Sequence, residues 1–65
     1  MTHSPRATAQ LGLVHQALGH WELAAPLVKK ALATPEDPWI KKNLTPLRDA
    51  LETIKQHLPP SSPPS

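Results

Sequence analysis

Apolar residues in the first third of the chain recur at the spacing of an amphipathic helix. Ser4 followed by Pro5 is typical of a helix start, because a serine cap accepts a hydrogen bond and proline removes a donor that has no partner. Gly19 is typical of a helix end. The pattern predicts a helix between these points with one apolar face turned inward. The members of that face are Ala7, Leu11, Val14 and Leu18.

A second amphipathic run follows at once and predicts a helix from His20 or Trp21 to about Ala33. Pro26 lies inside this run and removes the hydrogen bond to the carbonyl of Glu22. Because it falls about one turn from the start, we expect a bend and no break. The residues expected to point inward are Trp21, Ala24, Leu27, Val28, Ala31 and Leu32.

The third helix is expected to begin at Asp37-Pro38, which repeats the pairing of a cap with a proline. Its apolar positions continue without interruption past Pro46, which favours one long, bent helix. The alternative is a new helix at Thr45-Pro46, with a short turn over residues 38–44. The apolar positions are Ile40, Leu44, Leu47, Leu51, Ile54 and Leu58.

These elements predict an all-α, three-helix domain over residues 1–58 and a disordered Pro/Ser tail over residues 59–65. Trp21 is interpreted as a core residue, and Trp39 as either core or partner anchor. The side chains expected to be mostly buried are Leu11, Val14, Leu18, Trp21, Leu27, Val28, Leu32, Ile40, Leu44, Leu47, Leu51 and Ile54.

The size and charge of the chain indicate which kinds of partner and compartment to expect. A chain of 65 residues without cysteine has a marginal core and no disulfide to support it, so association is expected. The net charge is +2 and the basic residues are scattered, which is a weak indication of nucleic-acid binding. There is no apolar run of about 20 residues and no signal-peptide layout, so we expect a cytoplasmic protein without a membrane segment.

The sequence offers little reactive chemistry. Four histidines are present, namely His3, His15, His20 and His57, but none pair three or four residues apart on one helix. The chain has no cysteine and no glycine-rich phosphate loop, and its carboxylates are scattered. We therefore expect no metal, no cofactor and no enzymatic activity.

The first two helices contain a motif. Leu11-Gly12 is followed by His15, then by Ala24 and Val28 four residues apart. This spacing resembles the tetratricopeptide repeat, whose pattern is W-x2-L-G-x2-Y, A-x3-F and a final proline. The segment "LGHWELA" is also similar to the turn between the helices of that repeat. Gly12 and Ala24 would then let two antiparallel helices approach closely.

The resemblance covers one repeat, from about Ala7 to Pro35, with the third helix as a cap. It implies a non-enzymatic protein-interaction scaffold that is the end of a longer array or that pairs with another chain, including by self-association. It also implies a groove that takes a helix or an apolar peptide. The groove-facing residues would be Arg6, Ala9, Leu13, Gln16 and Ala17. The alternative function is a small helical nucleic-acid-binding protein that uses its lysine pairs.

Overall fold

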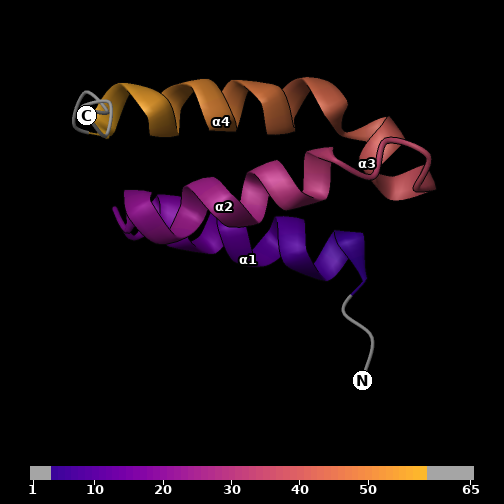
Figure 1. Cartoon of the computed structure of the whole chain (residues 1–65), viewed down its shortest axis with the longest axis horizontal. Helices are drawn as coiled ribbons and strands as arrows, with labels where there is room; N and C mark the ends of the chain where they lie inside the picture. The colour runs from indigo at the N-terminus through magenta and orange to yellow at the C-terminus, as the bar shows by residue number, and fades with distance from the viewer. Residues whose placement is uncertain (1–3, 59–65) are drawn as a thin grey trace, which may run out of the picture.

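The computed structural model describes residues 4–58, and these residues form four helices and no strand (Figure 1). The all-α prediction is confirmed. The Pro/Ser tail predicted at residues 59–65 lies outside the described residues, as do residues 1–3. The helices are α1 at Pro5–Ala17, α2 at Trp21–Leu32, α3 at Pro38–Lys42 and α4 at Leu44–His57.

The predicted ends of α1 are confirmed. The Ser4 hydroxyl accepts a hydrogen bond from the Ala7 amide at 3.1 Å, and Pro5 is the first helical residue. Gly19 follows the other end with a φ of 78°, a left-handed conformation that glycine adopts without steric cost. The next helix, α2, also matches its predicted bounds. It continues through Pro26, whose side chain is exposed.

The expected long third helix is divided in two, so that part of the prediction is wrong. The Asp37 carboxylate caps α3 by accepting from the Trp39 and Ile40 amides at 3.0 and 3.1 Å. The helix then ends at Asn43, whose side-chain amide donates to the Trp39 carbonyl at 2.7 Å. The alternative boundary at Thr45-Pro46 lies close to this break, but the true break comes earlier.

Pro46 causes no bend because it lies in the first turn of α4. The first backbone hydrogen bond of this helix runs from the Leu47 amide to the Asn43 carbonyl at 3.0 Å. Amides that precede it have no partner within the helix, so proline at this position loses no hydrogen bond.

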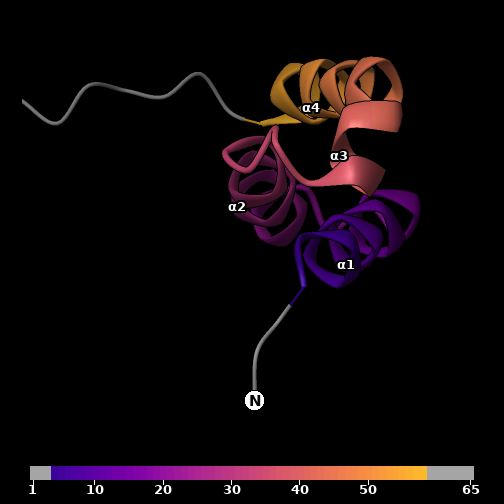
Figure 2. The ribbon, with the colours of Figure 1, turned by 90° about the vertical axis from the view of Figure 1, so that its right-hand side faces the viewer.

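The helices form a two-layer arrangement (Figures 1 and 2). The first layer is the antiparallel pair of α1 and α2, and the second is α4, which packs mainly against α2. The short helix α3 contacts α1 at the open end of the pair. As a result, one side of the helical pair is covered by α3 and α4, and the opposite side is not.

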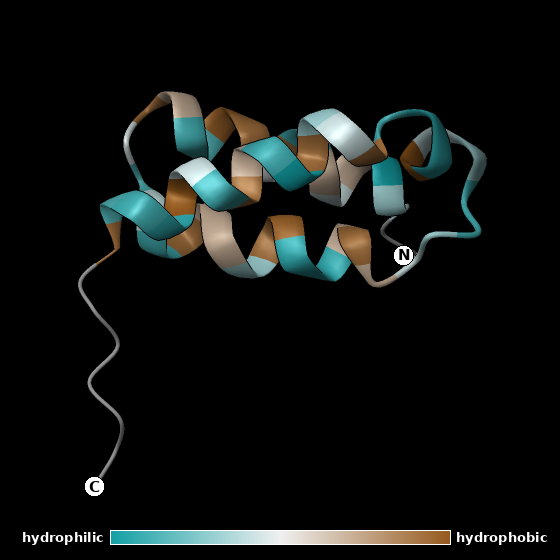
Figure 3. Cartoon of the chain, turned by 90° about the horizontal axis from the view of Figure 1, so that it is seen from above, coloured by the Kyte–Doolittle hydropathy of each residue, from teal (hydrophilic) through white to brown (hydrophobic). Residues whose placement is uncertain are grey.

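The core lies between the two layers. Hydrophobic and hydrophilic residues alternate along each helix (Figure 3). One cluster joins α1 and α2 to α3 and the start of α4, and a second joins α2 to the rest of α4. The first consists of Ala9, Ala31, Ile40 and Leu47. The second consists of Ala24, Ala25, Val28 and Ile54. Trp39 packs at the edge of the first cluster and Trp21 at the edge of the second.

The predicted inward face of α1 is wrong. Leu11, Val14 and Leu18 are 48%, 53% and 64% exposed, and Ala7 is exposed as well. The other side chains expected in the core are buried or half-buried; among them Val28, Ile40, Leu47 and Ile54 are 1% exposed or less. The apolar pattern therefore predicts the buried residues of α2 and α4 correctly, but it predicts the wrong buried side for α1.

Candidate interaction surface

The close contact between α1 and α2 explains the orientation of α1. A Cβ atom at Gly12 would lie 2.9 Å from Val28 Cγ2 and 3.2 Å from the Val28 amide nitrogen. Helical residues advance by about 100° each, so Val14 points almost opposite to Gly12. Since Gly12 faces α2, the side of α1 that carries Val14 is left without cover.

Four large apolar side chains are consequently exposed on the uncovered part of the α1–α2 pair. Leu11, Val14 and Leu18 lie on one side of α1, and Leu23, at 55% exposed, lies in the first turns of α2. We call these four residues the outer face. Single exposed apolar residues are common on protein surfaces, whereas a contiguous group is typical of an interaction site.

Two shallow hollows adjoin the outer face. One has a volume of about 300 Å³ and contains Leu11 together with Leu27, with Lys30 also in its lining. The other, of about 360 Å³, adjoins Leu23 and contains Trp21, whose ring stacks on that of His57 at 4.0 Å between centroids. The hollow beside Leu11 lies between α1 and α2, whereas the hollow beside Leu23 lies between the start of α2 and the end of α4.

The residues expected to line a groove do not form one surface. Ala9 is fully buried and Leu13 packs against the first core cluster, so α3 and α4 cover the face on which they lie. That expectation is corrected for these two residues. Gln16 is half-buried and Ala17 is exposed. Arg6 is exposed, and its guanidinium carbon lies 5.9 Å from the centroid of the Trp39 ring.

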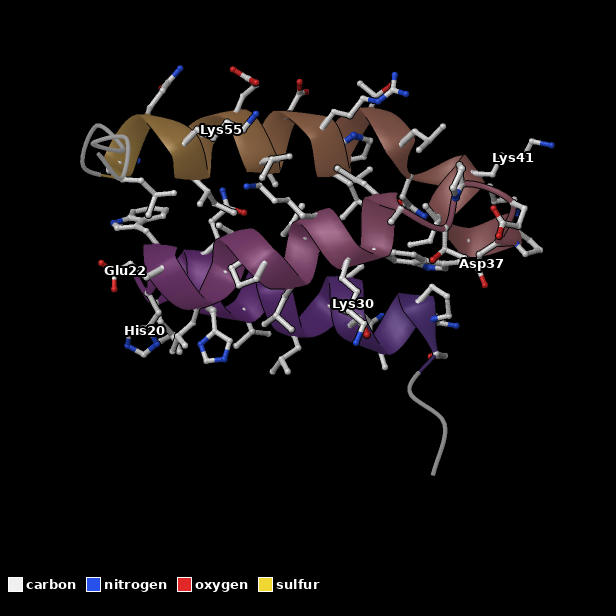
Figure 4. The ribbon with its side chains drawn as sticks, in the orientation of Figure 1. His20, Glu22, Lys30, Asp37, Lys41 and Lys55 are labelled. Atoms are coloured by element: carbon white, nitrogen blue, oxygen red, sulfur yellow. The ribbon has the colours of Figure 1, made fainter. Side chains whose placement is uncertain are left out.

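The lysine pairs lie on different parts of the molecule. Lys29 and Lys30 are exposed in the last turn of α2, and Lys41 and Lys42 are exposed at the end of α3. Figure 4 shows Lys30 and Lys41 pointing in different directions. A phosphate backbone is bound by basic side chains gathered on one surface, and these pairs do not form such a stripe.

The turn between α1 and α2 brings together two histidines that the sequence spacing did not pair. His15 Nδ1 and His20 Nδ1 are 3.2 Å apart, and the ring centroids are 5.4 Å apart. Metal-binding pairs on one helix are three or four residues apart, whereas these two histidines are five residues apart across a turn. Within residues 4–58, no group of three or more metal-ligating side chains is present.

Comparison of this chain with protein-family models, curated proteins and solved structures finds no match. Along the part of the chain that the structure describes, no helix has the length and apolar character needed to span a membrane.

Proposed function

We propose that this protein is a non-enzymatic protein-interaction module whose contact surface is the outer face. The observation that carries the proposal is the exposure of Leu11, Val14, Leu18 and Leu23 in a chain of this size. Burial of such a side chain from full exposure contributes about 1.5–3 kcal/mol. A partner that covers them would therefore gain free energy from surface that the fold leaves in contact with water.

The size of that gain sets a requirement on the partner. Because the four side chains are about half exposed, covering them contributes roughly 1 kcal/mol each, or about 4 kcal/mol together. This only equals the lower bound of the cost of association, which is about 4–15 kcal/mol. The partner must therefore also fill the hollow that Leu11 and Leu27 line, as an amphipathic helix or an extended apolar peptide lying along α1 would do.

The tetratricopeptide resemblance supports the same class of function. Gly12 lies at the close contact of α1 with α2, and Ala24 is fully buried, as that resemblance leads one to expect. Modules of this kind are interaction scaffolds, and the proposal places this chain among them without adding a catalytic step.

A charge on the outer face tests the proposal. In Val14→Glu and Leu18→Glu, binding to a captured protein partner is expected to weaken by at least about tenfold, or 1.4 kcal/mol, because an unpaired carboxylate would be buried at the contact. Affinity capture followed by quantitative titration measures this effect. Both positions are exposed, so circular dichroism is expected to show unchanged helicity.

Gln56→Glu is the matched control, because it adds the same charge at an exposed position on α4. It is expected to bind as the wild type does. If titration with duplex DNA shows binding that replacement of Lys29, Lys30, Lys41 and Lys42 by alanine abolishes, and the outer-face variants capture protein as the wild type does, the nucleic-acid alternative replaces this proposal.

A further inference from the structure

We propose that His15 and His20 chelate a divalent transition-metal ion through their two Nδ1 atoms. The proposal is independent of the function assigned to the outer face. It rests on the geometry of the turn between α1 and α2, which brings two imidazole rings together.

The backbone of the turn fixes the positions of both residues. The His20 amide donates to the His15 carbonyl at 2.8 Å, and the Gly19 amide donates to the Gln16 carbonyl at 3.0 Å. These two hydrogen bonds and the positive φ of Gly19 define a Schellman motif. In that motif the side chains of the two residues whose hydrogen bond spans more of the chain, here His15 and His20, commonly meet, and an apolar contact is usual there. Here the meeting side chains are two imidazoles.

The separation of the two nitrogens fits a chelate. Metal–nitrogen bonds to histidine are about 2.0–2.1 Å, which places two nitrogens about 3.3 Å apart at a tetrahedral angle and about 2.9 Å apart at a right angle. The observed distance of 3.2 Å lies between these values. The separation of the nitrogens therefore permits one ion to reach both, although the rings, whose centroids are 5.4 Å apart, must rotate so that both lone pairs point at that ion.

The protonation of the rings is compatible with chelation. Two neutral imidazoles at this distance share one Nδ1–H in a hydrogen bond. Chelation requires both Nδ1 atoms to be free of protons, so each neutral ring carries its proton on Nε2 instead. The contact between the two side chains is exposed, so an ion can reach it from solution and take the place of the shared hydrogen bond.

The helix termini around the pair have opposite effects on a cation. His15 lies in the last turn of α1, where the helix dipole favours positive charge. His20 lies at the N-cap of α2, where the dipole of that helix disfavours positive charge. Glu22, the acidic residue of the first turn of α2, lies at the same end of the molecule as His20 (Figure 4). Its carboxylate offsets the positive end of α2.

The ligand chemistry selects the class of ion. Imidazole nitrogens suit Zn²⁺, Cu²⁺ and Ni²⁺, whereas Mg²⁺ and Ca²⁺ prefer oxygen. Since residues 4–58 contain no group of three ligands, water completes the coordination. The site is therefore a two-histidine chelate with open positions.

Zinc titration of the full chain, followed by NMR of the histidine side-chain nitrogens, tests the proposal. The background is His3→Ala, because His3 lies outside the described residues. Zn²⁺ is expected to shift Nδ1 of His15 and His20 together, with one ion per chain, and to leave the proton of each ring on Nε2. Isothermal titration is expected to show affinity reduced by about tenfold or more in His15→Ala and in His20→Ala.

His57→Ala is the matched control, since the His57 Nδ1 already donates to the Thr53 carbonyl at 2.9 Å. This variant is expected to bind Zn²⁺ as the background does. The proposal is overturned if the two Nδ1 resonances do not respond together, or if His57→Ala lowers the affinity as much as His15→Ala. The NMR result on the unsubstituted pair does not depend on how any alanine variant folds.

Discussion

Ile54→Ala is expected to destabilise the protein by about 2–5 kcal/mol, because it deletes a fully buried side chain between α2 and α4 and leaves a cavity. A domain of 65 residues has a total stability of roughly 3–10 kcal/mol, from about 0.05–0.15 kcal/mol per residue. The substitution therefore removes a large part of the stability. Urea unfolding followed by circular dichroism measures the change.

Leu11→Ala provides the control for this experiment. Leucine and isoleucine have the same number of carbons, but Leu11 is 48% exposed and lies inside α1. Its replacement is expected to lower stability by about 1 kcal/mol or less, because about half of the side chain is already in contact with water. If Leu11→Ala lowered stability as much as Ile54→Ala does, the side of α1 that carries Leu11, Val14 and Leu18 would face inward. The outer face would then be part of the core.

Gly12→Val is expected to destabilise the fold by about 1–3 kcal/mol, because the added side chain overlaps Val28 and forces α1 away from α2. The nearest obstacles include the Val28 amide nitrogen at 3.2 Å, which belongs to the backbone and cannot rotate away. Thermal unfolding is expected to show a lowered midpoint.

Ala17→Val separates this steric effect from the effect of valine on helix formation. Ala17 is the last residue of α1 and is exposed, so valine at this position has no neighbour to overlap. It is expected to lower stability only through its weaker helix propensity, by less than about 0.7 kcal/mol. A Gly12→Val variant as stable as Ala17→Val would contradict the close approach of the two helices.

The parts of the fold that depend on local chemistry could be predicted from the sequence. Ser4 and Asp37 cap helices because short oxygen-bearing side chains accept from the free amides of the next turn. Gly19 ends α1 because the backbone there adopts a positive φ. Each of these features depends on a few adjacent residues, so the sequence alone predicts it.

The orientation of α1 depends on packing, and the sequence pattern was misleading. Its largest apolar residues share one side, so periodicity alone places them in the core. Gly12 carries no side chain and adds nothing to such a pattern, yet it decides which side meets α2. Gly12 and Val14 are about 200° apart around the helix, so they cannot both face α2. The close contact expected at Gly12 is therefore incompatible with a buried Val14.

The remaining differences also have physical causes. The apolar spacing continues through Asn43, so it gave no indication that the chain divides there into α3 and α4. The contact between His15 and His20 was missed because it depends on the path of a turn and not on the repeat of a helix. Ala9, expected in a groove, is buried because small residues permit the closest packing.

Site-specific photo-crosslinking tests directly whether the outer face binds a protein. A photoreactive amino acid is placed at Leu18 on the outer face or at Arg48, an exposed residue of α4, in the full chain within its host cell. We expect protein adducts from position 18 that Val14→Glu suppresses, and none from position 48. Adducts from position 48 alone, or adducts from position 18 that persist in Val14→Glu, would contradict the claim that the outer face is the interaction surface.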